Sequence, residues 1–339
     1  MAQTLWDTTG TDIVKALLAE RRAAGALASG LALTLVVVVD EKNVAEAESA
    51  ATTAAAAHPC RLLIVVRRKV DGDIRLDAEV QVGGRLGPTE AVVMRTYGRL
   101  ALHAESVVLP LLAPDAPVVT WWHGAPPDEI ATDALGVLAN RRITDSARAA
   151  DPLASLRRRA EDFAPGDTDL AWTRTTPWRS LLAAALDACP VEGAAKAVVG
   201  CEPKNPSASL LAGWLQSRMG AATTVEDSSG PGITQAEVAI GSSYRIGVTR
   251  PDGRLATLSR GDEPERQLPL PRRDLGDLLA EELRRMDPDY VYADALAAAT
   301  GVTGLDQRPP TRSHVWRDPA WGAEGAEGSV PAGTTGSSA

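Results

Sequence analysis

The 339-residue chain is long enough to form two compact domains, each with a hydrophobic core of its own. Apolar residues make up 45% of the chain and charged residues 23%, which is typical of a globular protein and not of a fibrous or disordered one. Acidic residues outnumber basic residues by 44 to 35. The resulting net charge of −9 disfavours nucleic acid and anionic lipid, so we expect neither as a partner.

The three cysteines, Cys60, Cys189 and Cys201, are odd in number and lie far apart without a C-x-x-C pair. They predict neither a disulfide framework nor a zinc site, and they indicate a reducing compartment. The apolar run over residues 23–39 contains two glycines and ends without a cleavage-like site, so we do not interpret it as a secretory signal. We therefore expect a cytoplasmic protein that has no membrane partner.

The first third of the chain has the pattern of a strand–helix–strand unit. The continuous, β-branched run over residues 31–39 indicates a strand buried on both faces, as in a parallel sheet covered by helices. The alanine-rich stretch that follows has a strong helix propensity, and Pro59 ends it. In chain order we expect a helix from Thr11 or Asp12 to Gly25 or Gly30, a strand over 31–39, a helix over 43–57 and a strand over 61–68.

Apolar and polar residues then alternate over residues 74–82, after the turn signal Asp71-Gly72. This pattern predicts a hairpin with the strand over 61–68, which would make the sheet mixed. Further along we expect a strand over 91–97, a helix over 100–112 and a strand over 118–122.

The second half repeats a comparable order of elements. Asn205 and Pro206 mark the start of its clearest helix, and the turn signal Pro251-Asp252-Gly253 predicts a hairpin. We expect strands over 197–201, 236–240, 245–249 and 254–259, and helices over 206–219 and 275–286. The predicted fold is α/β, with two related lobes whose mixed, mainly parallel sheets are flanked by helices. The predicted domains are 1–165 and 166–305, followed by a mostly disordered tail over 306–339.

The segment over residues 169–179 holds two of the eight tryptophans in a chain with only 4% aromatic residues. Its side chains Trp172, Arg174, Trp178 and Arg179 are of the types that anchor a protein to a partner. The same enrichment suits a buried seam between two lobes, with Trp178 and Arg179 facing inward. Both interpretations stay open.

Trp121, Trp122 and His123 end a predicted parallel strand, where open α/β sheets bind their ligands. Core packing explains them equally well. The sequence contains no glycine-rich dinucleotide motif after the first long strand, no P-loop, no G-x-S-x-G and no H-E-x-x-H. Gly230-Pro231-Gly232 is typical of a turn, and the short run Arg272-Arg273 of a solvated surface. We therefore predict no catalytic residue, metal or cofactor.

Several motifs occur in a characteristic order, and together they resemble one family. They are Thr8-Thr9, His58-Pro59-Cys60-Arg61, the stretch 106–122, Arg142-Ile143-Thr144-Asp145-Ser146, the stretch 167–179 and Leu211-Ala212-Gly213-Trp214-Leu215. In series they are similar to the OpcA family of glucose-6-phosphate dehydrogenase assembly proteins, in its actinobacterial form.

The resemblance implies a non-catalytic cytoplasmic partner that promotes assembly or allosteric activation of glucose-6-phosphate dehydrogenase, which begins the oxidative pentose phosphate pathway. It supplies no catalytic residues. The candidate partner or cleft contacts are Trp121, Trp122, His123, Trp172, Arg174, Trp178 and Arg179.

A second hypothesis is a sugar-phosphate or nucleotide-sugar enzyme with a cleft between two α/β lobes. In that case aromatic rings would stack on a sugar or base, and guanidinium groups would hold a phosphate. The residues expected to converge in the cleft are Trp121, Trp122, His123, Arg174 and Arg179.

Overall fold

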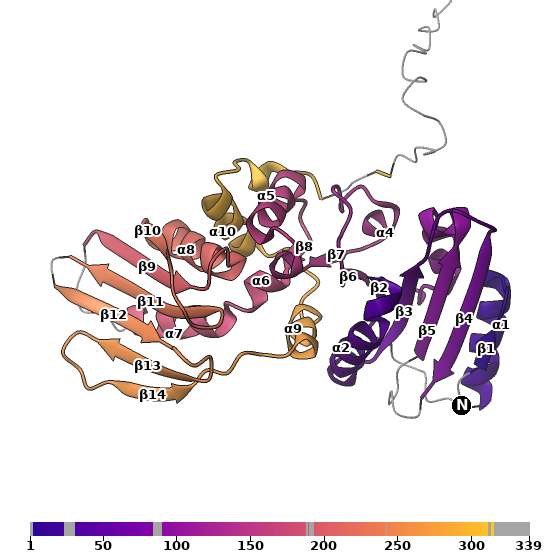
Figure 1. The fold of residues 1–339 in the computed structure, drawn as a ribbon, viewed down its shortest axis with the longest axis horizontal. Coiled ribbons are helices and arrows are strands. Elements are labelled where there is room, and N and C mark those ends of the chain that lie inside the picture. The colour runs from indigo at the N-terminus through magenta and orange to yellow at the C-terminus, as the bar shows by residue number, and fades with distance from the viewer. Residues whose placement is uncertain are drawn as a thin grey trace, which may run out of the picture.

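The computed structural model describes residues 3–23, 31–83, 90–187, 189, 193–241, 243–310 and 313–314. These residues form two lobes, each built on one sheet with helices packed against it (Figure 1). The predicted α/β class and the mixed character of the sheets are confirmed.

The first sheet has eight strands in the order β1-β4-β5-β3-β2-β6-β7-β8. The six strands from β5 to β8 are parallel, and their order is that of a doubly wound sheet. The strands are β1 (Gln3–Leu5), β2 (Leu33–Val39), β3 (Cys60–Arg67), β4 (Arg75–Val82), β5 (Glu90–Tyr97), β6 (Val118–Trp122), β7 (Arg141–Thr144) and β8 (Asp167–Asp169).

Helices cover both faces of this sheet, and each face has its own apolar core. Thr9, and not the predicted Thr11 or Asp12, caps the first helix, because its hydroxyl accepts a hydrogen bond from the Asp12 N–H. The expected end of that helix, at Gly25 or Gly30, lies outside the described residues. The helices are α1 (Gly10–Ala23), η1 (Glu41–Asn43), α2 (Val44–Ala57), η3 (Gly98–Leu102), α3 (Glu105–Val108), η4 (Leu109–Leu111), α4 (Ala134–Val137), η5 (Ser146–Arg148) and α5 (Pro152–Asp162).

Two predictions for this lobe are wrong. The strand over 74–82 does not form a hairpin with the strand before it, because β3 is apolar on both faces and takes β2 and β5 as parallel neighbours. The alternating strand β4 instead pairs antiparallel with β5. The helix predicted over 100–112 is broken into η3, α3 and η4, since Pro110 cannot continue an α-helical hydrogen-bond ladder.

The second sheet has six strands in the order β10-β9-β11-β12-β13-β14. Only β9 and β10 are parallel, and every other neighbouring pair is antiparallel. The strands are β9 (Ala195–Cys201), β10 (Ala222–Asp227), β11 (Ile233–Ile240), β12 (Tyr244–Thr249), β13 (Leu255–Arg260) and β14 (Arg266–Pro269).

The mainly parallel pairing that we expected therefore holds for the first sheet and not for the second. Short turns such as the one at Pro251-Asp252-Gly253 can join only antiparallel strands, whereas the parallel pair β9 and β10 needs a helix between its strands. The two sheets also differ in strand order, so their strand pairing does not repeat from one lobe to the other.

The helices of the second half are α6 (Leu170–Thr173), α7 (Thr176–Asp187), α8 (Pro206–Met219), α9 (Leu275–Glu282), α10 (Tyr290–Thr300) and η6 (Leu305–Gln307). The predicted cap of α8 is confirmed, because the Asn205 side chain accepts a hydrogen bond from the Ala208 N–H at 3.1 Å. Helix α9 ends at Glu282, one turn earlier than the predicted limit at Met286.

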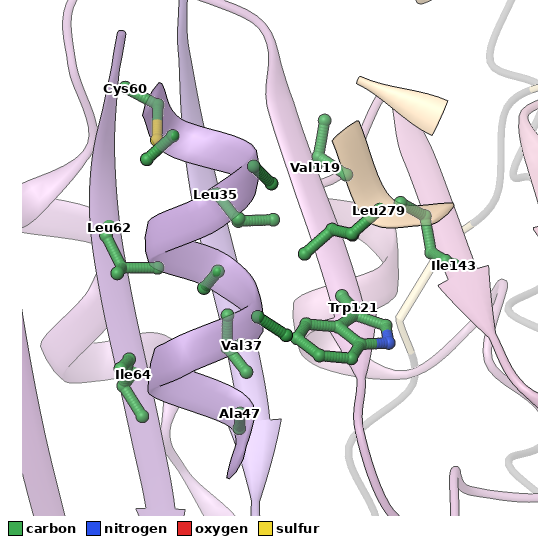
Figure 2. Packing of buried hydrophobic residues seen from close by; sticks show 14 of the residues in the cluster. Leu35, Val37, Ala47, Cys60, Leu62, Ile64, Val119, Trp121, Ile143 and Leu279 are labelled. Atoms are coloured by element: carbon green, nitrogen blue, oxygen red, sulfur yellow. The ribbon is translucent and has the colours of Figure 1, made fainter. Parts of the chain in front are cut away.

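The chain crosses back to the first lobe through α9, which packs on α2. Figure 2 shows Leu279 of α9 beside Val119 and Ile143 of the first sheet. Arg141 of β7 and Glu282 of α9 form a buried ion pair across the same seam. The lobes are thus joined by shared core packing and not by a linker alone.

Strand β8 pairs with β7, so the first sheet extends just past residue 165. The division into domains 1–165 and 166–305 remains a proposal. Most of the tail predicted over 306–339 lies outside the described residues.

Candidate functional site

Trp121 and Trp122 occupy opposite faces of the first sheet, as neighbouring residues of a strand must. Both side chains are fully buried. Trp121 lies in the core shared with α2 and α9 (Figure 2), and Trp122 lies in the core beneath α1. Their apolar rings therefore fill the two layers between sheet and helices.

His123 follows β6 at the carboxyl edge of the sheet and is also buried. Its ring meets the Trp121 ring edge to face, with centroids 5.2 Å apart. The His123 Nε2 lies 3.2 Å from a carboxylate oxygen of Glu46. Burial, and then the charge of Arg148, lower the pKa of His123 below 6.5, so the imidazole is held neutral near pH 7.

A cavity of about 520 Å³ opens at this edge, and we call it the strand-end cavity. It lies beyond the ends of β2, β6 and β7, where a doubly wound sheet normally binds its ligand. Asp40 and His123 come from the first two of those strands and Asp145 from the third. The turn after β2 has no glycine and begins with Asp40 and Glu41, whose carboxylates would repel a pyrophosphate.

Two of the sequence motifs that resemble the family meet at the ends of β7 and β8. The buried Asp169 carboxylate accepts hydrogen bonds from the Thr144 hydroxyl at 2.8 Å, from the Ser146 N–H at 3.0 Å and from the Ala171 N–H at 2.8 Å. Asp167 pairs with the buried Arg142 on the neighbouring strand. These motif residues join the last strand to α6, and sequence alone could not show the pairing.

An ionic chain runs from the strand-end cavity toward the second lobe. Glu46 accepts two hydrogen bonds from Arg148, both at 2.8 Å. Arg174 donates two to Asp145, at 2.6 and 2.7 Å. Bidentate geometry of this kind holds guanidinium groups in fixed orientations. Of the candidates Trp172, Arg174, Trp178 and Arg179, it is Arg174 that takes part in this ionic chain.

Trp172, Trp178 and Arg179 face inward, which agrees with the seam interpretation of this segment. Trp172 and Trp178 are both 1% exposed. The Trp172 Nε1–H donates to Asp289 at 2.9 Å, and the Arg179 guanidinium lies 3.5 Å from the centre of the Trp172 ring. Burial lowers the pKa of Arg179 to about 10. The outward orientation that we considered for Trp178 is not observed.

A second cavity of about 300 Å³ lies between the lobes, and we call it the interlobe cavity. Its lining combines η5 and α9, which pack with the first lobe, with α7 and α8 of the second. Five arginines line it against a single glutamate, Glu202. The arginines are Arg148, Arg174, Arg250, Arg272 and Arg273.

The expected convergence of candidate residues is therefore only partial. Arg174 and Trp178 line the interlobe cavity and His123 lines the strand-end cavity, whereas Trp121, Trp122, Trp172 and Arg179 line neither. Sequence reasoning missed Arg250 altogether, and it placed Arg272-Arg273 on a solvated surface. Isolated arginines on separate strands and loops leave no local pattern, so only the fold shows that they meet.

The cysteines show no sign of activation. Burial raises the pKa of Cys60 to about 12 and that of Cys201 to about 11, which suppresses the reactive thiolate. Cys189 is half-buried. Among the described residues no three His, Cys, Asp or Glu side chains are grouped as a metal site would require.

No helix in the described part of the chain has both the length and the apolar character needed to cross a bilayer.

Comparison with solved structures finds distant likenesses of low score. KijD10, a 3-ketoreductase from Actinomadura kijaniata seen with NADP, is 13% identical with a TM-score of 0.42, covering 84% of this chain and 100% of its own. Levoglucosan dehydrogenase is 9% identical with a TM-score of 0.44, covering 79% and 94%. A Gfo/Idh/MocA family oxidoreductase from Vibrio cholerae is 10% identical with a TM-score of 0.35, covering 79% and 95%. Likenesses at this level say nothing about activity.

No curated protein sequence matches this chain. Two family models do match it, and they follow one another along the sequence. Residues 51–161 match the N-terminal domain, and residues 165–296 the C-terminal domain, of the protein described as the glucose-6-phosphate dehydrogenase subunit. The matched regions contain the paired motifs at the ends of β7 and β8, and the resemblance seen in the sequence is confirmed: the chain belongs to the OpcA family.

Proposed function

We propose that this protein is a non-catalytic assembly factor or allosteric activator of glucose-6-phosphate dehydrogenase in the cytoplasm, acting in the oxidative pentose phosphate pathway. The observation that carries the proposal is the pair of matched domains, whose descriptions both name a subunit of that enzyme. A subunit named after an enzyme acts by contact, so the dehydrogenase is the proposed partner.

The buried seam between the lobes supports a role as a rigid binding partner. Glu282 accepts hydrogen bonds from Arg141 of the first sheet and from the Thr173 hydroxyl of α6, at 2.6 Å in the latter case. Trp172 and Asp289 add a further bond across the second half. A surface presented by lobes held in this way loses little conformational freedom on binding. The seam tryptophans would thus support a contact surface without belonging to it.

An activator must bind the active form of its partner more tightly than the inactive form. A tenfold shift in that equilibrium requires about 1.4 kcal/mol of differential binding energy. One well-packed contact can supply this amount. The proposal therefore needs no chemical step on this chain.

The test is to titrate the purified full-length chain into glucose-6-phosphate dehydrogenase from the same cells. We expect kcat, KM or the oligomer mass measured by light scattering to change and to saturate at a fixed stoichiometry. Glu282→Ala removes the carboxylate of the seam, and we expect it to weaken the effect on the dehydrogenase. Glu161→Ala removes a carboxylate from an exposed helix and should leave that effect unchanged. If saturating protein alters neither kinetics nor mass, the proposal fails.

The alternative, a sugar-phosphate or nucleotide-sugar enzyme, draws support from the arginines of the interlobe cavity. The described lining of that cavity includes no histidine that could serve Ser207 as a base, and its one carboxylate, Glu202, accepts a hydrogen bond from the Asn205 amide at 3.1 Å. Turnover of a sugar phosphate by the isolated chain, abolished by a substitution in the cavity, would favour the enzyme over the activator.

A further inference from the structure

Arg250 is the most unusual charged residue of the interlobe cavity. It is only 6% exposed, yet no carboxylate forms an ion pair with it among the described residues. Its two terminal nitrogens donate to the carbonyl oxygens of Leu270 and Ile233, both at 2.9 Å, and its Nε has no partner within the described structure. A buried cation without a counter-charge is costly unless an anion lies close to it.

The fold holds the Arg250 guanidinium in one place. Its central carbon lies 5.0 Å from the centre of the Trp178 ring, and both groups line the cavity. The aromatic face and the two carbonyls together restrict rotation of the side chain. Nε is closed off from solvent, so the donors left for a ligand are the second N–H groups of the two terminal nitrogens, which the fold orients before any ligand arrives.

The other arginines of the lining differ in how their charge is balanced. Carboxylates that lie outside the cavity lining pair with Arg148, Arg174 and Arg273. Arg272 is exposed and, in the described residues, has neither an ion pair nor a side-chain hydrogen bond. Arg250 and Arg272 thus carry the excess positive charge.

Burial, followed by the neighbouring charge of Arg272, lowers the pKa of Arg250. The only acidic residue of the lining is Glu202, which accepts a hydrogen bond from the Asn205 amide at 3.1 Å. Repulsion between the two arginines would be relieved by an anion placed between them.

Backbone groups favour the same kind of ligand. Asn205 and Ser207 place the N-terminus of the 14-residue helix α8 at the cavity wall, where the helix dipole favours negative charge. Gly232, which also lines the cavity, has φ +67°, and a Cβ there would lie 3.8 Å from the Arg250 guanidinium and 4.0 Å from that of Arg272. The glycine is therefore required by the backbone conformation, and both guanidinium groups lie beside it.

We propose that the interlobe cavity binds the phosphate monoester of a small metabolite, with Arg250 and Arg272 holding the phosphoryl oxygens. A phosphate monoester carries about two negative charges at neutral pH and accepts several hydrogen bonds, which matches two unpaired guanidinium groups and a helix N-terminus. The volume of about 300 Å³ lies at the lower end of small-ligand sites, so a sugar-sized ester fits and a dinucleotide does not. This inference does not depend on the proposed partner.

The test is calorimetric titration of the isolated full-length chain with glucose 6-phosphate, ribose 5-phosphate, AMP, inorganic phosphate and glucose. We expect at least one monoester to bind with one-to-one stoichiometry and more tightly than inorganic phosphate, whereas glucose does not bind. Absence of binding by all three monoesters at millimolar concentration would overturn the inference. Equal binding of inorganic phosphate and the esters would also overturn it, since the organic part would then make no contact.

Substitutions locate the site. Arg272→Gln lies at an exposed position and should fold normally, yet it should weaken the bound monoester by at least about tenfold. Arg22→Gln makes the same charge change at an exposed position on α1 and should leave affinity unchanged. Glu202→Gln should strengthen binding, because it removes the opposing charge. If Arg272→Gln binds like the wild type, or Glu202→Gln binds more weakly, the ligand lies elsewhere.

These measurements use no dehydrogenase, so their outcome is separate from that of the activator test. A chain that binds a monoester without affecting the dehydrogenase would leave the cavity assignment standing. A chain that activates the dehydrogenase and binds no monoester would leave only the proposed function.

Discussion

The strand-end cavity and the interlobe cavity share Arg148 but differ in the charge around it. The first lies where doubly wound sheets bind ligands, and its lining mixes acidic residues such as Asp40 and Asp145 with basic ones. The second lies where no strand-order rule would place it, and five of its side chains are arginines. Fold position and charge therefore point to different cavities. On charge, the interlobe cavity is the one suited to an anionic ligand.

Trp178 is expected to show the largest effect, because it is both core and wall of the interlobe cavity. Trp178→Ala removes a side chain that is 1% exposed and should lower the free energy of unfolding by about 3–5 kcal/mol. Urea denaturation measures this. Trp6→Ala is the control, since Trp6 is 69% exposed and its loss should cost less than about 1 kcal/mol. Equal losses would place Trp178 outside the core.

The ion pair that ties the lobes together should come next. Glu282→Ala leaves Arg141 buried without its carboxylate, which should destabilise the fold by about 3 kcal/mol or more. Glu161→Ala breaks an exposed helix pair with Arg157 and should cost no more than about 0.5 kcal/mol. Thermal unfolding of both variants tests the difference. A small effect of Glu282→Ala would mean that the seam is held by apolar packing alone.

His123 gives the strand-end cavity a dependence on pH. Its pKa is lowered on folding, so the neutral ring stabilises the fold above pH 6.5, and this contribution is lost as the pH falls further. Glu46 and Asp145 act in the opposite direction but do not outweigh burial and Arg148. We expect the urea midpoint to fall between pH 7 and pH 5 by more in the wild type than in His123→Gln. Identical pH slopes would contradict this.

The smallest effect concerns the thiols, which line neither cavity. At pH 8, iodoacetamide should leave Cys60 and Cys201 unmodified in the folded protein, because their pKa values are about 12 and 11. The half-buried Cys189 should carry most of the label found by mass spectrometry. All three should react in urea. Rapid labelling of Cys60 in the native chain would contradict its burial and its raised pKa.

Strands with a continuous apolar run were predictable, and so was the well-capped helix α8. Leu33–Val39 and Cys60–Arg67 are buried on both faces, so nearly every position of each strand needs an apolar side chain, and the sequence shows this directly. Short strands such as β7 and β8 were missed. Their buried arginines and aspartates, Arg142 and Asp167 among them, look like surface residues until each finds its partner on the next strand.

The amino-acid sequence by itself determined the α/β class, the local elements with strong periodicity and the family, because each depends on neighbouring residues or on motifs in a fixed order. Only the tertiary structure decided that the second sheet is mainly antiparallel, that the tryptophans are internal, and that Arg250 and Arg272 meet. Strand order and convergent charge arise from contacts between residues far apart in the chain. Such contacts leave no pattern among neighbouring residues, because they form only when the chain folds.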